Sequence, residues 1–167
     1  MGEDKTLDIL KNAILLEKRG KSFYATVASQ TGNEAVRRFF KQMAAEEDSH
    51  ISILSEQFKS YSDTHRFQSP AFDTEPSGAF AADVINADLT EQVSAASFEA
   101  ASIAAAMAME KNAISLYSRR AEEAQDKNEK ALYKWLADWE KTHLEFLAAI
   151  DRELTEKIWN DNNFWPF

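Results

Sequence analysis

The chain has 167 residues, of which 44% are hydrophobic. This length suits one domain, and the apolar content is enough for one sizeable core, so extensive disorder is excluded. There are 28 acidic and 19 basic residues, a formal net charge of −9, and no cysteine. The charge excludes general nucleic-acid binding, which needs a basic surface. The absence of cysteine excludes disulfides, a thiol nucleophile and any cysteine-ligated zinc or iron–sulfur centre.

The sequence leads us to expect neither a signal peptide nor a membrane-spanning helix. The chain starts with the acidic stretch Met1-Gly-Glu-Asp, whereas a secretory leader starts basic and then turns apolar. The longest uncharged stretch near the middle, Ala100 to Met109, has ten residues and is too short to span a bilayer. We therefore expect a soluble, cytoplasmic protein.

Four long segments carry apolar residues at helical spacing. In chain order they predict helices over residues 6–30, 34–61, 91–125 and 129–159. The short breaks at 31–33 and 126–128 stop one helix and start the next. Residues 62–90, with Pro70, Pro76 and Gly78, predict a long connection that contains a short helix near 80–87.

The order of the connections, short then long then short, determines the expected topology. Short turns force neighbouring helices to run antiparallel, and only the middle connection can travel the length of a bundle. The sequence therefore predicts an all-α protein, a four-helix bundle of two antiparallel hairpins joined by one crossover over residues 62–90. We expect residues 1–167 to form a single domain that ends in an aromatic tail, 158–167.

An internal repeat relates the two hairpins. When the sequence is shifted by 93, positions 13–54 align with 106–147 without a gap, and 11 of the 42 pairs are identical. The shift superimposes Glu17 on Glu110 and Tyr24 on Tyr117. One helical hairpin is thus the repeating unit, and two of them build the bundle.

Each hairpin offers one glutamate on its first helix and a Glu-x-x-His motif on its second. Residues three apart lie on one helical face, so Glu47 and His50 can reach one ion together, as can Glu140 and His143. In both hairpins the lone glutamate precedes the motif by 30 residues, which predicts similar heights in an antiparallel pair. Four glutamates and two histidines that converge on the bundle axis would suit two divalent iron or manganese ions.

Helical glutamates are usually solvated, and a lone histidine on an apolar face is more often a hydrogen-bonded core residue than a ligand. With 17 glutamates and three histidines in the chain, chance would produce roughly 0.3 Glu-x-x-His motifs. Two occur, in register with the repeat. All four glutamates also replace apolar residues on the core-facing stripes, where an unpaired carboxylate is very costly. The pattern therefore favours a metal site.

These motifs resemble those of rubrerythrin, in the ferritin-like superfamily. The resemblance rests on the stretches that start at Ala13-Ile14-Leu15-Leu16-Glu17-Lys18 and Met109-Glu110-Lys111, and on the two Glu-x-x-His motifs, and it covers roughly residues 6–157. It implies a ferritin-like bundle and a non-haem di-iron centre that reacts with hydrogen peroxide or dioxygen, commonly in a homodimer. The metal ligands that it implies are Glu17, Glu47, His50, Glu110, Glu140 and His143.

The chain departs from the rubrerythrin pattern in two respects. Rubrerythrins usually carry a further carboxylate three residues after the third-helix glutamate, and this position is Ala113 here. They also commonly append a cysteine-rich rubredoxin domain, whereas this chain has no cysteine, so we expect an external electron donor. A di-iron peroxidase or ferroxidase is the leading hypothesis. Iron sequestration or storage without turnover, or a structural zinc or manganese bundle, are the alternatives.

The remaining aromatic and histidine positions support further expectations. Tyr24 and Tyr117 lie two turns beyond a ligand glutamate, where a hydroxyl can hydrogen-bond a ligand carboxylate, although a core tyrosine would show the same pattern. We expect Trp135 and Trp139 to fill the bundle and His65 to lie at the surface. The aromatic tail is expected to dock on the bundle or on a partner subunit.

Overall fold

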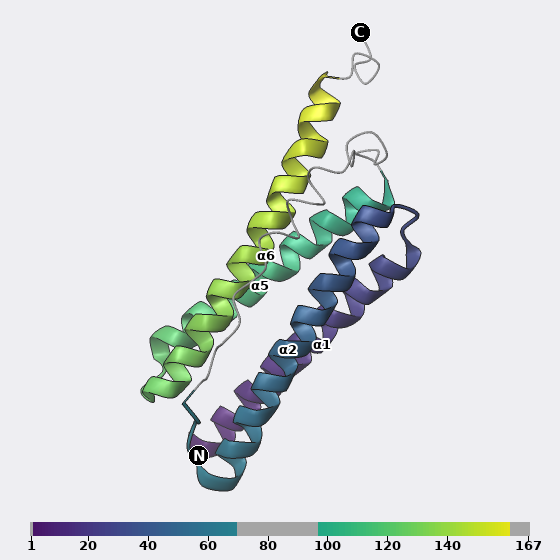
Figure 1. Cartoon of the computed structure of the whole chain (residues 1–167). Helices are drawn as coiled ribbons and strands as arrows, with labels where there is room; N and C mark the ends of the chain where they lie inside the picture. Colours follow the sequence, from purple (N-terminus) through teal and green to yellow (C-terminus); the bar gives the residue numbers. More distant parts are fainter. Residues whose placement is uncertain (1, 70–96, 161–167) are drawn as a thin grey trace.

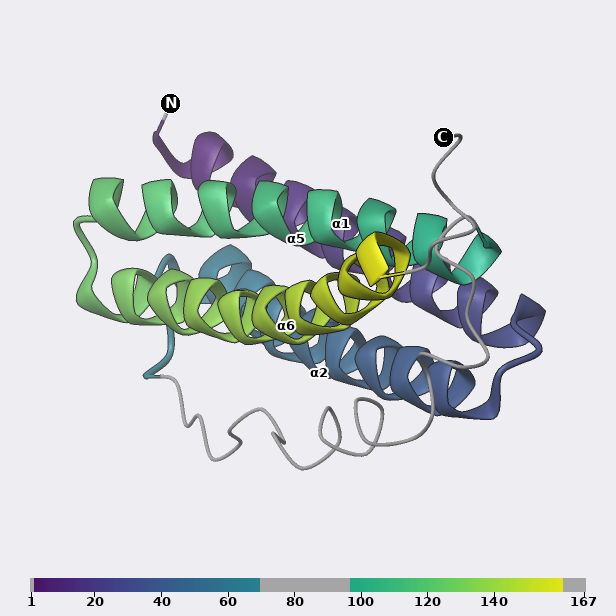
Figure 2. The ribbon, with the colours of Figure 1, turned by 90° about the horizontal axis from the view of Figure 1, so that it is seen from above.

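The computed structural model describes residues 2–69 and 97–160 (Figure 1), and these form long helices. The helices are α1 (Gly2–Gln30), α2 (Glu34–Thr64), α5 (Phe98–Glu123) and α6 (Lys127–Asn160). Helices α1 and α2 pack as one antiparallel hairpin and α5 and α6 as another, and the hairpins lie side by side (Figure 2). The predicted four-helix bundle is therefore confirmed.

Both hairpin turns use the same capping chemistry. The Asn33 side chain accepts a hydrogen bond of 3.0 Å from the backbone N–H of Val36 in the first turn of α2. The Asp126 side chain accepts from the backbone N–H groups of Asn128 and Glu129, at 2.7 and 3.1 Å. Asn33 and Asp126 are 93 positions apart, so the repeat extends to the residues that start each second helix.

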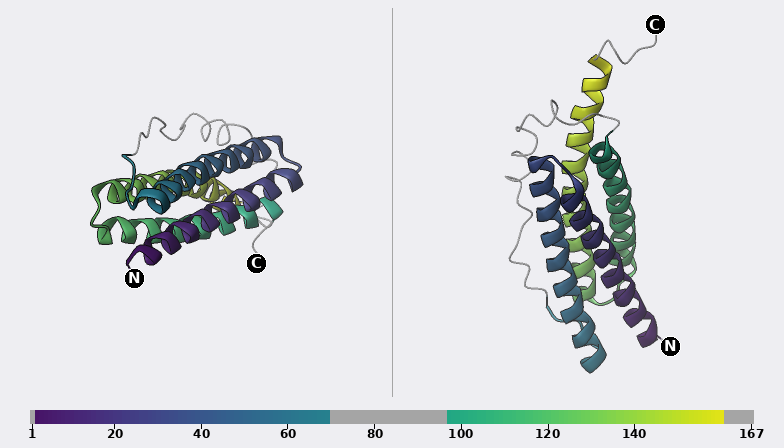
Figure 3. Two further views of the ribbon diagram at one scale, coloured as in Figure 1. Left: turned by 90° about the horizontal axis from the view of Figure 1, so that it is seen from below. Right: turned by 90° about the vertical axis from the view of Figure 1, so that its right-hand side faces the viewer.

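The connection between the hairpins joins opposite ends of the bundle. Helix α2 ends where His65 adopts the left-handed conformation at φ 54°, and its backbone N–H donates to the carbonyl of Tyr61. Helix α5 begins at the far end of the bundle, as two further views show (Figure 3). The end of α2 and the start of α5 therefore lie at opposite ends of the bundle.

Several predicted helix ends were wrong by a few residues. Helix α1 begins four residues earlier than expected, at Gly2, and α2 ends three residues later, at Thr64. Helix α5 begins at Phe98 because Ser97 is extended and its side chain caps the helix, and it ends two residues early, at Glu123. Helix α6 begins two residues early, at Lys127, because Asp126 is its capping residue, and it ends one residue late. The expected short helix at 80–87 lies outside the described residues.

The apolar core consists of two clusters. The first lies toward the α1–α2 turn and contains Phe40, Ile103 and Leu147, each at most 1% exposed. The second lies toward the α5–α6 turn and contains Leu10, Leu54 and Leu132, all fully buried. The polar residues of the predicted metal site separate the two clusters along the helices, so apolar side chains cover this site from both ends.

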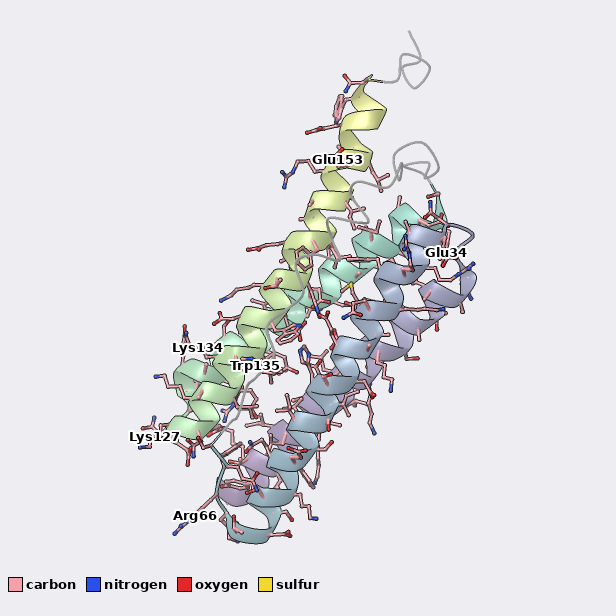
Figure 4. The ribbon with its side chains drawn as sticks, viewed as in Figure 1. Glu34, Arg66, Lys127, Lys134, Trp135 and Glu153 are labelled. Carbon is pink, nitrogen blue, oxygen red and sulfur yellow. The ribbon has the colours of Figure 1, made fainter. Side chains whose placement is uncertain are left out.

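Charged side chains occupy the outer surface. Glu34, Lys134 and Glu153 point away from the bundle (Figure 4). A search of the described helices for a long apolar stretch of the kind that crosses a bilayer found none. The third histidine, His65, is exposed at the end of α2, as expected. Trp159, at the end of α6, is also exposed, while tail residues 161–167 lie outside the described ranges.

We expect Asn33→Ala to lower the free energy of unfolding by about 1 kcal/mol, because the first turn of α2 loses its side-chain cap. For a chain of this size the melting temperature should fall by about 2–4 °C in scanning calorimetry. Ser52→Ala, at an exposed position within the same helix, is the control and should change stability by less than about 0.5 kcal/mol. Equal melting temperatures for the two variants would contradict this role of Asn33.

Candidate metal centre

The structure brings all six predicted ligand side chains together near the middle of the bundle. One comes from α1, two from α2, one from α5 and two from α6. Each of the six residues is at most 3% exposed. They are Glu17, Glu47, His50, Glu110, Glu140 and His143. Their helices converge here because each ligand occupies a core-facing position of its helix, between apolar residues one or two turns away.

The six side chains form two overlapping groups, each with ligand atoms within 4.8 Å of one another. The first group contains Glu17 and His50, and the second contains Glu110 and His143. Glu47 and Glu140 belong to both groups. The shift of 93 converts one group into the other, so the repeat relates two similar positions for an ion.

Two buried tyrosines connect the hairpins at this centre. The hydroxyl of Tyr24, on α1, donates a hydrogen bond to Glu110 on α5. The hydroxyl of Tyr117, on α5, donates to Glu17 on α1. Each tyrosine lies two helical turns after the lone glutamate of its own helix. Its hydroxyl nevertheless bonds the lone glutamate of the opposite hairpin. Together the two bonds orient both lone carboxylates and couple α1 to α5.

Glu46 is a further polar residue at the centre, and the sequence reasoning missed it. Its Oε2 atom lies 2.7 Å from Nε2 of His143 and accepts a hydrogen bond of 3.0 Å from Nε1 of Trp139. Its Oε1 atom accepts from the side-chain amide of Gln42 at 2.8 Å. The sequence carried one weak signal, since Glu46 lies next to Glu47 and aligns with Trp139 in the repeat.

The two histidines have different surroundings. Nε2 of His143 faces Glu46, whereas Nε2 of His50 is buried and has no hydrogen-bond partner among the described residues. The His50 ring instead packs perpendicular to Trp135 and Trp139, with ring centroids 5.5 and 5.3 Å away. The tryptophans were expected to fill the bundle, and they do so against the site itself.

In the metal-free protein the carboxylates share protons. Burial, together with the nearby charges of Glu140 and Glu17, raises the pKa of Glu47 well above its ordinary value. Burial and the charge of Glu140 raise the pKa of Glu110 to about 8. Glu140 behaves oppositely, because although burial acts to raise its pKa, the charge of His50 and a hydrogen bond with His143 lower it.

The histidines provide the positive charge in this arrangement. Burial acts to lower the pKa of each histidine, but the surrounding carboxylates reverse this effect. Glu140 contributes most to the raised pKa of His50, and hydrogen bonds with Glu110, Glu140 and Glu46 raise that of His143. Without a metal ion, protons on the histidines therefore balance part of the negative charge. Metal ions would replace these protons, because a histidine ligand must be neutral.

The donor set fits divalent cations. Nδ1 of His50 lies within 3.0–3.4 Å of oxygens of Glu17, Glu47 and Glu140, so several lone pairs converge on one small volume. Oε1 of Glu140 is buried and makes no well-aligned hydrogen bond among the described residues, although Nδ1 of His50 lies 3.0 Å away. A buried carboxylate oxygen with such incomplete pairing is costly, and a cation would satisfy it. Carboxylate and imidazole ligands without thiolates suit iron or manganese, and zinc can also bind them.

A small cavity adjoins the carboxylates between α1 and α5. Its volume of about 20 Å³ is enough for roughly one water-sized molecule. Outside the carboxylates its walls include Leu16, Gly20, Met109 and Ala113, which form two pairs related by the shift of 93. Ala113, where rubrerythrins usually have a further carboxylate, therefore contributes a small apolar wall beside the candidate site.

We predict that the metal-free protein loses stability as the pH rises from about 5 to 8. The pKa of Glu110 is about 8 when folded and 4.5 by default, so in this window the folded state binds more protons than the unfolded state, and the free energy of unfolding falls with pH. The raised pKa values of Glu47 and both histidines act in the same direction, and Glu140 is ionised in both states.

For each extra proton that the folded state binds relative to the unfolded state, the melting temperature should fall by about 3–5 °C per pH unit. Scanning calorimetry of the chelator-treated protein at several pH values measures this slope. Glu110→Gln cannot ionise at this position and should show a shallower slope. A metal-free protein whose stability increases with pH over this window would contradict the shared protonation described above.

Comparison with known proteins places the chain in a family. The sequence model of the rubrerythrin family matches residues 8–151, which include all of α2 and α5, most of α1 and α6, and all six candidate ligands. No significant match was found among curated proteins. Among solved structures, a hypothetical protein from Pyrococcus furiosus has a similar fold, with a TM-score of 0.60, 23% sequence identity and 90% of each chain covered. Because the match covers most of the chain and part of every helix, this chain belongs to the rubrerythrin family.

Proposed function

We propose that this protein is a di-iron oxidoreductase that reacts ferrous iron with hydrogen peroxide or dioxygen. The observation that carries the proposal is the pair of overlapping ligand groups that share Glu47 and Glu140. When bound, two ferrous ions would supply one electron each. With two protons, these electrons are enough to convert hydrogen peroxide to two water molecules, or dioxygen to hydrogen peroxide, without release of a radical. The membership of the rubrerythrin family supports iron as the metal.

In this proposal each ion has one histidine and one terminal glutamate. Glu17 and His50 would hold one ion, and Glu110 and His143 would hold the other. Glu47 and Glu140 would bridge the two ions, because only these two carboxylates occur in both groups. The bridging positions are also the second-helix glutamates of the two Glu-x-x-His motifs, which the repeat relates to each other.

The other residues around the centre would control access and orientation. Tyr24 and Tyr117 hold the terminal carboxylates by hydrogen bonds, which limits their rotation during the reaction. The apolar clusters above and below exclude bulk water, which strengthens the electrostatic interactions between ligands and ions. The cavity beside Gly20 and Ala113 has a size that suits peroxide or dioxygen better than any larger substrate.

The absence of a carboxylate at Ala113 restricts the mechanism. The described ligand groups contain four glutamates and no side chain from position 113. The proposed reaction therefore does not involve a carboxylate from this position that replaces another ligand. The chain also has no cysteine that could form an electron-donating iron centre. Turnover would therefore depend on an external electron donor, which re-reduces the ions after each reaction.

We expect about two Fe(II) ions to bind per chain when the metal-free protein is titrated under anaerobic conditions, as measured by elemental analysis after desalting. His50→Ala and His143→Ala should each retain about one ion, because each histidine faces only one ligand group. His65→Asn is the matched control, since this exposed histidine lies outside the centre and asparagine tolerates its left-handed backbone. Loss of iron in the control as well, or no iron in any form, would count against the proposal.

We also expect hydrogen peroxide to oxidise the ferrous protein rapidly, with about two Fe(II) consumed per peroxide because each ion gives one electron. Stopped-flow absorbance measures the rate. Tyr24→Phe removes the hydrogen bond to Glu110 and should slow oxidation or weaken iron binding by about 10–100-fold. Tyr61→Phe, outside the centre, should behave as the wild type.

Other outcomes would separate the alternative functions. A metal-loaded protein that binds zinc or manganese and shows no redox reaction would indicate a structural bundle. Oxidation by dioxygen that ends in retained ferric iron, together with a native mass of a large shell, would indicate storage. The proposal instead expects repeated turnover with a reductant, in a homodimer.

A further inference from the structure

The internal repeat duplicates the six candidate ligands but not the residues behind them. Positions 46 and 139 correspond in the repeat, and so do positions 42 and 135. The first hairpin has Gln42 and Glu46 at these positions, whereas the second has Trp135 and Trp139. Because each hairpin places these side chains against the histidine of the other hairpin, the two histidines face unlike partners.

His143 is supported by a complete hydrogen-bond network. Nδ1 of its ring faces the candidate ion position, 3.0 Å from Glu140, and Nε2 is 2.7 Å from Oε2 of Glu46. Gln42 donates a hydrogen bond to Glu46, and the indole N–H of Trp139 lies 3.0 Å from Oε2 of Glu46 and 3.2 Å from Nε2 of His143. These contacts hold the Glu46 carboxylate in place. The Glu46 side chain is only 14% exposed, so these contacts are shielded from solvent.

His50 lacks such support. Nδ1 of its ring also faces carboxylates, at 3.0 Å from Glu140, but Nε2 has no hydrogen-bond partner among the described residues. Trp135 extends from α6 toward α2 and packs perpendicular to the His50 ring (Figure 4), as does Trp139. Edge-to-face packing with aromatic rings is a weaker interaction than a hydrogen bond to a carboxylate.

We propose that Glu46 is a positioning residue that makes the two metal positions unequal. It fixes the ring of His143 and increases the donor strength of its Nδ1 atom, so the position with Glu110 and His143 binds a divalent cation more tightly. The position with Glu17 and His50 is then filled second. This inference rests on the proposed function, because it assumes that the two ligand groups hold metal ions.

Two physical effects of Glu46 act in the same direction. A carboxylate that accepts the second N–H of a ligand histidine orients the ring and makes it more basic toward the metal, and removing such a partner typically costs about 10–100-fold in affinity. The partly buried negative charge of Glu46 also attracts a cation to the nearer of the two positions. The directly facing ligands are matched pairs in the repeat, so they do not create this inequality themselves.

The experiment is a competition titration of the metal-free, full-length protein with Co(II) against a chromophoric chelator. The wild type should show two classes of site that differ by about 10-fold or more. Glu46→Gln keeps the shape of the side chain and one acceptor oxygen but removes its charge. It should weaken the tighter class by about 10–100-fold and leave the weaker class within about threefold.

Asp48→Asn is the matched control. It removes one negative charge from the same helix, two residues away, where the side chain is exposed and pairs with Lys21. It should change both classes by less than about threefold, because solvent screens its charge. Gln42→Ala provides a second test that leaves the Glu46 charge intact. It removes one hydrogen bond that orients Glu46 and should weaken the tighter class by a smaller factor than Glu46→Gln.

A spectroscopic readout assigns the tighter class. In NMR spectra with one equivalent of Co(II), protein carrying ¹⁵N-labelled histidine should show a paramagnetically shifted, exchangeable Nε2–H signal. This signal should disappear in His143→Ala and persist in His50→Ala. Two equal sites in the wild type, a first ion at His50, or equal effects of Glu46→Gln and Asp48→Asn would overturn the inference while leaving the proposed metal centre intact. Failure of the wild type to bind Co(II), Fe(II) or Mn(II) would overturn both.

Discussion

The burial of four carboxylates and two imidazoles on the bundle axis is the constraint on which the rest of the structure depends. Such a set is costly in an apolar interior unless protons or cations balance its charge. In the metal-free chain, protons on the histidines and raised pKa values of Glu47 and Glu110 provide part of this balance. A pair of divalent ions would do so more completely, and it would release these protons.

The two apolar clusters shield this centre from water, and the tyrosine hydrogen bonds connect the two hairpins around it. Phe40 and Leu147 on one side, and Leu54 and Leu132 on the other, close the interior to water. The bonds from Tyr24 to Glu110 and from Tyr117 to Glu17 cross between the hairpins, so neither hairpin could build the centre alone. The polar site thus helps to define how the two repeats pack, and it is not simply inserted into a finished bundle.

The two repeats of this member of the rubrerythrin family differ outside the ligand positions. The ligand positions are duplicated, whereas Glu46 and Trp139, at equivalent positions, provide one histidine with a carboxylate and the other with indole rings. Ala113 and Gly20 likewise leave a small apolar cavity beside the ligands. Differences of this kind can adjust metal affinity and access while the ligand set itself stays the same.

The sequence by itself determined the bundle, the two hairpins and the six converging side chains, because helical periodicity, loop length and a 93-residue repeat are local or linear signals. It was less reliable at helix ends such as Phe98, where Ser97 rather than an earlier residue provides the cap. Only the tertiary structure decided that Tyr24 bonds the opposite hairpin and that Glu46 supports His143. Those contacts depend on the rotation and height of one helix against another, which the pattern along a single chain does not specify.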